Sequence, residues 1–158
     1  MSQYELDFFV SWEELHKAGR QLAKALHDLK EWKGILTVTR GGMVPSAIIA
    51  RELNIRMIDT ICISSYDGQD RGKLTLSKAP DIEDDGAGWL MIDDLVDTGK
   101  TAAEVRARYP KAHFATIYAK PAGIDYVDSY VHEVTQKTWI RFPWDMKLSY
   151  ADPIIKGG

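Results

Sequence analysis

The chain of 158 residues is 45% hydrophobic and 27% charged, a composition typical of one folded domain with a sizeable apolar core. Its formal net charge of −3 argues against the basic face that a nucleic-acid partner needs. No apolar run is long enough to span a bilayer, no signal-peptide pattern opens the chain, and the single cysteine, Cys62, excludes an internal disulfide. We therefore expect a cytoplasmic protein, with peripheral association with the inner face of the cell membrane as an alternative.

The N-terminal third of the chain predicts a helix, a strand and a second helix. Ser11 and Glu14 have capping-box spacing, and apolar residues follow at helical intervals, so the first helix should run to about Lys30. A strand is expected over 34–39. The second helix should end at Asn54, which tolerates the left-handed conformation of a helix C-terminus.

Arg40, Gly41 and Gly42 connect that strand to the second helix. A glycine pair at such a junction can be no more than a tight turn. With an arginine directly before it, the junction also has the properties of an anion cradle. Glycine admits a ligand to the backbone, and the guanidinium offers a bidentate pair of donors.

A strand is expected over 57–64, and the character of the chain then changes. Residues 67–88 are polar and charged, with four glycines and a proline, and they are too many for a tight connection. The segment is therefore either a lid or a disordered loop. We favour a mobile lid over about 67–87, with a short strand arm at Leu74–Leu76.

The most informative stretch begins at Trp89. Four apolar residues predict a buried strand, Asp93 and Asp94 follow at its carboxyl end, and Asp97 precedes a turn over 98–101 that opens a helix to about Arg108. Open α/β sheets bind ligands at this edge, and helix N-termini bind anions. A lone turn of this kind often only caps a helix, but three neighbouring carboxylates repel one another unless a cation or donors intervene.

Two nucleotide motifs are excluded in this stretch. A P-loop that ended at Thr101 would need glycine in place of Asp94. The glycines at 86 and 88 precede the strand instead of following it, so they do not form a dinucleotide fingerprint.

A further buried strand is expected over 112–119, with Lys120 at its end. Strands that alternate with helices in this way predict a doubly wound, mostly parallel α/β sheet. After Gly123 the pattern becomes a series of aromatic, charged and proline-containing pieces without a clear period.

The stretch 92–101 resembles the phosphoribosyl-pyrophosphate signature of the type I phosphoribosyltransferases. The flanking sequence is similar to the bacterial xanthine-guanine branch of that family, and the resemblance covers nearly the whole chain except 68–87. The segments that carry it are 32–35, 40–42, 61–67, 120–123, 138–140 and 143–146.

The resemblance implies a single phosphoribosyltransferase domain over 1–158, with a small hood from about 124–158 that closes over the purine base. It implies a Mg²⁺-dependent glycosyltransferase of purine salvage. The enzyme would transfer 5-phosphoribosyl from phosphoribosyl pyrophosphate to guanine, to xanthine and less well to hypoxanthine, and release pyrophosphate. It also implies a homotetramer with no nucleic-acid partner.

The resemblance further assigns the residues that bind phosphoribosyl pyrophosphate. The turn would hold the 5-phosphate, the carboxylate pair the ribose hydroxyls, and the loop at Arg40, after a cis Thr39–Arg40 peptide, the pyrophosphate. Arg71 or Lys73 would fold over from the lid, and Asp94 would also bind Mg²⁺. The full set is Arg40, Gly41, Arg71, Asp93, Asp94, Leu95, Val96, Asp97, Thr98, Gly99, Lys100 and Thr101.

For the purine, the resemblance implies four contacts. Asp97 would act as general acid/base on N7, Lys120 would donate to the 6-oxo group, Trp139 would stack on the ring, and the Ile140 carbonyl would meet the 2-substituent. The order of preference among guanine, xanthine and hypoxanthine stays open, and so does the way a 2-oxo group is accepted.

Two alternatives were weighed against this prediction. One is a nucleotide-binding regulatory protein on the same fold without significant catalysis, which the acidic balance and the retention of Asp97 disfavour. The other is a pyrimidine or adenine transferase, which Lys120 and Trp139 disfavour.

Overall fold

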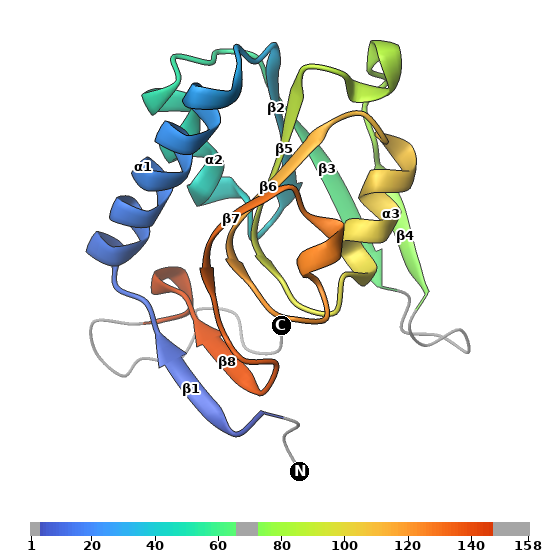
Figure 1. Cartoon of the computed structure of the whole chain (residues 1–158). Coiled ribbons are helices and arrows are strands. Elements are labelled where there is room, and N and C mark those ends of the chain that lie inside the picture. The colour runs from blue at the N-terminus through green and yellow to red at the C-terminus, as the bar shows by residue number, and fades with distance from the viewer. Residues whose placement is uncertain (1–3, 66–72, 147–158) are drawn as a thin grey trace, which may run out of the picture.

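The computed structural model describes residues 4–65 and 73–146. Their main feature is a six-stranded sheet in the order β4–β3–β2–β5–β6–β7, in which only β4 runs antiparallel to its neighbour (Figure 1). The predicted doubly wound, mostly parallel α/β fold is thereby confirmed. The strands are β2 (Gly34–Thr39), β3 (Ile58–Ser65), β4 (Leu74–Lys78), β5 (Trp89–Val96), β6 (His113–Ala119) and β7 (Ser129–Glu133).

Helices cover both faces of this sheet. α1 (Trp12–Leu29) and α2 (Met43–Glu52) pack on one face, and α3 (Lys100–Arg108) lies on the other (Figure 1). Short 3₁₀ turns occur at Glu83–Gly86, Ile124–Tyr126 and Pro143–Asp145. Among the described residues, no helix combines the length and the hydrophobicity needed to cross a membrane.

The predicted helix ends agree with the structure. The Ser11 hydroxyl accepts from the Glu14 N–H at 3.1 Å, and the Glu14 carboxylate accepts from the Ser11 N–H at 2.8 Å, which is the expected capping box. Beyond α2, Asn54 adopts φ +52°, the left-handed conformation expected at a helix C-terminus.

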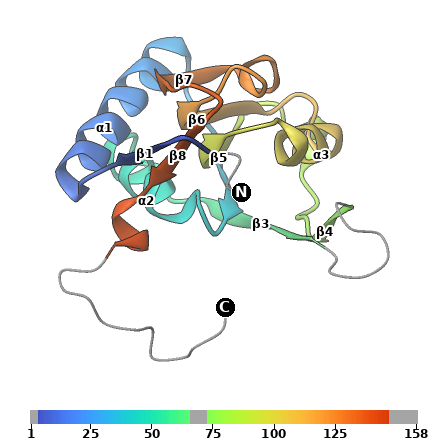
Figure 2. The same cartoon turned by 90° about the horizontal axis from the view of Figure 1, so that it is seen from below.

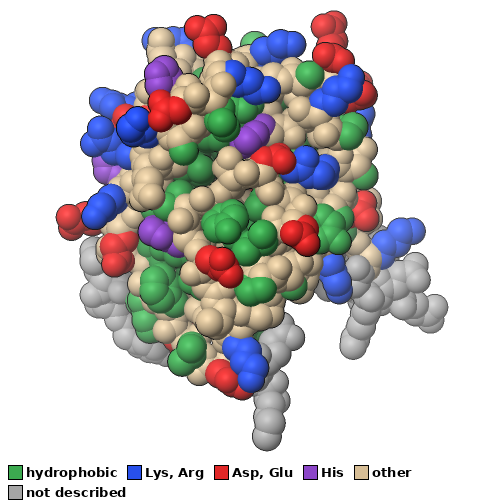
Figure 3. Space-filling model, viewed as in Figure 1, with side chains coloured by type: hydrophobic (Ala, Val, Ile, Leu, Met, Phe, Trp, Pro, Cys, Tyr) green, Lys and Arg blue, Asp and Glu red, His purple; other side chains and the backbone are tan. Residues whose placement is uncertain are grey.

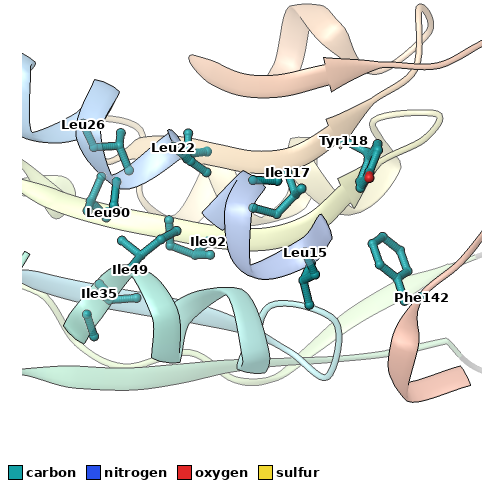
Figure 4. Close-up of a cluster of buried hydrophobic side chains, with 14 of the residues drawn as sticks. Leu15, Leu22, Leu26, Ile35, Ile49, Leu90, Ile92, Ile117, Tyr118 and Phe142 are labelled. Atoms are coloured by element: carbon teal, nitrogen blue, oxygen red, sulfur yellow. The ribbon is translucent and has the colours of Figure 1, made fainter. Parts of the chain in front are cut away.

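The sheet residues alternate between two apolar clusters, one on each face. Ile35, Leu90 and Ile92 point toward α1 and α2, where they meet Leu22 and Ile49 (Figure 4). The residues between them on the same strands join a second cluster against α3. Because both faces are buried, the strands carry the near-continuous apolar runs that marked them in the sequence.

A separate two-stranded parallel sheet lies beyond the carboxyl ends of the main strands (Figures 1 and 2). It pairs β1 (Leu6–Phe9) with β8 (Thr138–Arg141), and we call these two strands the hood. The structure differs from the expected hood over 124–158 in two ways. β7 belongs to the main sheet, where Val131 packs on the core, and the N-terminal residues supply half of the hood.

Part of the segment expected as a lid is held by contacts with the rest of the described fold. β4 is the expected strand arm, paired with β3. Beyond it, the Tyr109 hydroxyl donates to the Pro80 carbonyl at 2.6 Å, and Arg108 and Lys111 pair with Asp81 and Asp84. The lid stays a prediction, and these contacts confine it to residues before Pro80. Arg71 lies outside the described residues.

Candidate active site

A cleft of about 830 Å³ opens between the carboxyl ends of β2, β5 and β6 and the hood. It gathers residues from segments that are far apart in the chain. Lys73 is exposed and does not line it, so the choice between Arg71 and Lys73 stays open. The predicted site residues that line the cleft are Arg40, Gly41, Asp93, Asp94, Leu95, Asp97, Thr101, Lys120, Trp139 and Ile140.

A smaller recess of about 160 Å³ adjoins the cleft at the turn before α3, lined by residues 93–102 and Phe114. Gly99 has φ +83°, and a Cβ on it would lie 2.2 Å from the Tyr126 ring, so only glycine fits there. The helix that follows has no side-chain cap at its start. Its first backbone N–H groups, with the hydroxyls of Thr98 and Thr101, are therefore available to an anion of phosphate size.

Asp93 and Asp94 lie side by side near the end of β5, which extends past them to Val96. The Asp93 carboxylate accepts from the Asp94 N–H at 2.9 Å. Burial, together with the charge of Asp94, raises the pKa of Asp93 well above its ordinary value. Burial raises the pKa of Asp94 to about 6, and the Asp145 carboxylate acts in the same direction. This pair gains from any cation that enters the cleft.

The Arg40–Gly41–Gly42 loop packs tightly against these acids. A Cβ on Gly41 would lie 2.5 Å from the Asp94 carboxylate, and one on Gly42 would lie 2.2 Å from the Ile92 carbonyl. The Thr39–Arg40 peptide is cis, as the resemblance implied. Glycine is therefore required at both positions, because the loop backbone lies too close to β5 for a side chain. The loop brings its backbone and the exposed Arg40 to the carboxylate pair.

Asp97 and Lys120 form an ion pair at 2.9 Å between Oδ2 and Nζ. Lys120 is 1% exposed, and its backbone N–H donates to Val96 at the end of the neighbouring strand. Burying an ammonium group without a partner costs several kcal/mol, so the buried charge of Lys120 is stabilised by the Asp97 carboxylate. The strand-end positions of Asp97 and Lys120 bring together two residues that are 23 apart in sequence.

Two further side chains contact Asp97 that the sequence did not single out. The Tyr4 hydroxyl donates to Oδ2 at 3.1 Å, and Gln136 Nε2 donates to Oδ1 at 2.7 Å. The Tyr4 ring also lies 4.5 Å from Lys120 Nζ and 4.7 Å from the Trp139 ring, edge to face. Neither residue stands in a recognisable motif. Tyr4 reaches the site through the pairing of β1 with β8, and Gln136 through the pairing of β7 with β6.

The hood and the segment after it form an aromatic wall of the cleft. Trp139 is 41% exposed, whereas the neighbouring Ile140 is buried with its backbone in register with Phe8. Phe142 and Trp144 stack at 4.7 Å with their rings 6° from parallel. The cleft thus has a flat apolar surface opposite its charged edge, which suits a planar aromatic ligand.

We asked whether the carboxylates could hold a metal ion. The described residues contain no cluster of three or more His, Cys, Asp or Glu side chains. The adjacent Asp93 and Asp94, which both line the cleft, offer hard oxygen donors only. That set fits Mg²⁺, which takes one or two carboxylates and completes its shell with water and substrate oxygens.

Comparison with known proteins places this arrangement in a family. The phosphoribosyl transferase domain model matches residues 11–151. The xanthine-guanine phosphoribosyltransferase of Desulfotalea psychrophila is 55% identical over 97% of this chain and 95% of its own, and that of Chromohalobacter salexigens is 51% identical over 98% and 94%. A purine phosphoribosyltransferase from Pyrococcus horikoshii superposes with a TM-score of 0.75, at 25% identity, over 94% of this chain and all of its own.

The matches extend across the sheet, the turn before α3 and the hood, and they include every element that lines the cleft. The chain therefore belongs to the xanthine-guanine phosphoribosyltransferase family.

Proposed function

We propose that this protein transfers the 5-phosphoribosyl group from phosphoribosyl pyrophosphate to guanine and xanthine, and less well to hypoxanthine, in purine salvage. The products are GMP, XMP or IMP, and pyrophosphate. The observation that carries the proposal is the Asp97–Lys120 pair, which stands between the phosphate-sized recess and the aromatic wall of one cleft. A cytoplasmic location and a homotetramer belong to the same proposal.

In this proposal each part of the sugar substrate has its own binding groups. The recess at 98–101 takes the 5-phosphate through backbone N–H groups and hydroxyls. Asp93 and Asp94 accept from the ribose hydroxyls. Arg40 and the Gly41 backbone take the pyrophosphate, where the guanidinium can donate two parallel hydrogen bonds.

The purine would lie between the ion pair and the hood. Asp97 Oδ2 accepts from the N7 side of the base, Lys120 donates to the 6-oxo oxygen, and the ring stacks on Trp139. The Ile140 carbonyl accepts from the exocyclic 2-amino group of guanine. These contacts point N9 of the base toward the ribose held above Asp93 and Asp94.

During transfer, the bond from ribose C1 to pyrophosphate breaks with its electron pair on the pyrophosphate, and N9 forms the new bond to C1. The base must lose a proton, which Asp97 is placed to accept at N7 as a general base. Arg40 faces the charge that develops on the leaving group, so its contact strengthens as the bond breaks.

Asp94 would hold Mg²⁺, with waters and substrate oxygens as the remaining ligands. When bound, the ion would neutralise negative charge on the pyrophosphate. The Asp93 carboxylate accepts a hydrogen bond from the Asp94 N–H, so Asp93 would keep the Asp94 backbone in place.

The function is tested by following pyrophosphate release and GMP formation with the purified protein, guanine, phosphoribosyl pyrophosphate and Mg²⁺. Turnover that depends on all three reactants supports the proposal. Tight binding of nucleotides with no turnover for any of the three 6-oxo purines would favour the regulatory alternative instead.

Changing Asp94 to asparagine should raise the Mg²⁺ concentration needed for half-maximal activity by about tenfold or more, because even indirect changes around a metal ligand cost that much affinity. The measurement is a Mg²⁺ titration of the initial rate at saturating phosphoribosyl pyrophosphate. Asp125→Asn is the matched control, because Asp125 is exposed and lines neither the cleft nor the recess. An unchanged Mg²⁺ requirement in Asp94→Asn would remove Asp94 from the metal site.

Tyr4 contacts the same three side chains that the proposal assigns to the purine. A base bound to Asp97, Lys120 and Trp139 must therefore displace its ring, and the displaced contacts subtract from the affinity. One hydrogen bond contributes about 0.5–1.5 kcal/mol, so Tyr4→Ala should lower KM for guanine by about two- to tenfold with kcat nearly unchanged.

Steady-state kinetics with guanine as the varied substrate measure this effect. Tyr4→Phe, which keeps the ring but not the hydroxyl, should fall between the wild type and the alanine variant. A higher KM in Tyr4→Ala would show that the ring instead covers the bound base.

A further inference from the structure

Gln136 lies in the turn before β8 and bridges two parts of the cleft. Its Oε1 accepts from the Ala122 N–H at 2.9 Å, and its Nε2 donates to Asp97 Oδ1 at 2.7 Å. A backbone N–H can only donate, so it requires the amide oxygen to face Ala122. The amide NH₂ is thereby directed at the Asp97 carboxylate, and the orientation of the side chain is determined by its partners.

The contacts of Asp97 divide between its two oxygens. Oδ2 meets Lys120 and Tyr4, whereas Oδ1 meets Gln136. An aspartate whose carboxylate is anchored at one oxygen can still turn about its last torsion, which has a broad and shallow profile. Asp97 is 30% exposed, so packing does not prevent this rotation. A second donor on Oδ1 is what sets the plane of the carboxylate.

The backbone around Gln136 also couples the groups that would contact the purine. Ala122 stands two residues after Lys120, and Gln136 stands three residues before Trp139. One side chain therefore ties together the turn that carries Asp97, the loop behind Lys120 and the strand that carries Trp139.

We propose that Gln136 is a positioning residue for phosphoribosyl transfer, which holds the Asp97 carboxylate in the plane where Oδ2 faces the purine. This inference rests on the function proposed above, in which Asp97 acts on N7 of the base. Gln136 does not contact the reacting atoms. It acts through Asp97, so its effect should depend on the presence of that carboxylate.

Gln136→Met keeps the length of the side chain but removes both hydrogen bonds. Because small misplacements of a catalytic group can cost on the order of 10²-fold, we expect kcat for guanine to fall by roughly 10- to 100-fold. KM for phosphoribosyl pyrophosphate should stay within about twofold, since the hydrogen bonds of the Gln136 side chain go to Ala122 and Asp97 and not to the turn at 98–101. Gln21→Met, on the exposed side of α1, is the matched control.

A double-mutant cycle separates positioning from general stability. In the Asp97→Asn background, Gln136→Met should change kcat by less than about threefold, because the carboxylate that it positions is gone. An equal loss in both backgrounds, or wild-type turnover of Gln136→Met, would overturn the inference. Thermal melting of all four proteins checks that each is folded.

Gln136→Glu gives a second, isosteric test. Glutamate can still accept from Ala122 but presents an acceptor to Asp97, so turnover should fall at least as far as in Gln136→Met. Full activity of Gln136→Glu would also overturn the inference. Failure of the proposed function has a different signature, because the wild-type protein would then release no pyrophosphate with any of the three 6-oxo purines.

Discussion

Replacing Asp97 by asparagine should lower kcat for guanine by about 10²–10⁴, the range that a general acid or base contributes. Asparagine has the same size, but it offers one acceptor oxygen where Lys120 and Gln136 now find two. Its amide NH₂ would also face one of these donors. KM for phosphoribosyl pyrophosphate should change little, because the proposed 5-phosphate contacts are the backbone N–H groups and hydroxyls of residues 98–101 and not the Asp97 carboxylate.

Initial rates at saturating concentrations of both substrates measure this effect. Asp28→Asn, an exposed aspartate of α1 paired with Lys24, is the matched control and should keep wild-type turnover. If Asp97→Asn stays within about threefold of the wild type, far below the usual contribution of such a group, Asp97 has no part in the chemistry.

The charged edge of the site could be predicted from the sequence because its signals are local. One apolar run is followed by Asp93, Asp94 and the turn at 98–101, and another is followed by Lys120. Because the carboxyl ends of parallel strands lie at the same edge of a sheet, the sequence alone predicts that these residues lie near one another. Gly99 lies in the turn that the sequence predicted, and the structure shows that it adopts positive φ. The outcome in each case depends on residues within one strand–turn–helix unit.

The hood could not be predicted in this way. β1 reads Leu-Asp-Phe-Phe, and its side chains are exposed, so no alternation of buried and polar positions announces a strand. Its pairing of Leu6 with Thr138 joins the two ends of the chain. Tyr4 reaches Asp97 through that pairing, whereas Gln136 reaches it from the end of β7, where the Val134 N–H donates to the Ala119 carbonyl. No local pattern in the sequence contains this information.

The segment before β5 shows a related limit. A polar stretch with glycines and acids predicts a long loop, but Pro80, Asp81 and Asp84 are held by the last residue of α3 and by two residues of the turn that follows it. The bonds come from Arg108, Tyr109 and Lys111, whose direction in space follows from the packing of the helix. The composition of residues 67–87 therefore predicted a longer lid than the tertiary contacts of Pro80, Asp81 and Asp84 allow.

Charged side chains of both signs are mixed on the face of the molecule that Figure 3 shows. Figure 3 shows Lys and Arg side chains interspersed with Asp and Glu, and no continuous basic stripe appears in this view. Electrostatic attraction to a phosphate backbone requires such a stripe. The anion-binding features instead lie inside the cleft, at Arg40 and the turn before α3.

Adenine should be a very poor substrate, with kcat/KM lower than that of hypoxanthine by roughly 10⁴ or more. The two bases differ at position 6 and in the protonation of N1. Lys120 has donors only, so it satisfies a 6-oxo group, whereas the 6-amino group of adenine confronts donor with donor. Lys120 is 1% exposed, so water cannot replace the lost acceptor.

The comparison is sharpest with two pairs of bases. Guanine and 2,6-diaminopurine both carry the 2-amino group and differ at position 6, so they should show the same large ratio as hypoxanthine and adenine. Guanine and hypoxanthine differ only in the 2-amino group. In the proposed function this group donates a hydrogen bond to the Ile140 carbonyl, and one such bond contributes about 0.5–1.5 kcal/mol. Their ratio should therefore be only about three- to tenfold. If adenine or 2,6-diaminopurine reacts as fast as its 6-oxo partner, Lys120 does not hydrogen-bond to the group at position 6, and its ion pair with Asp97 has a structural role only.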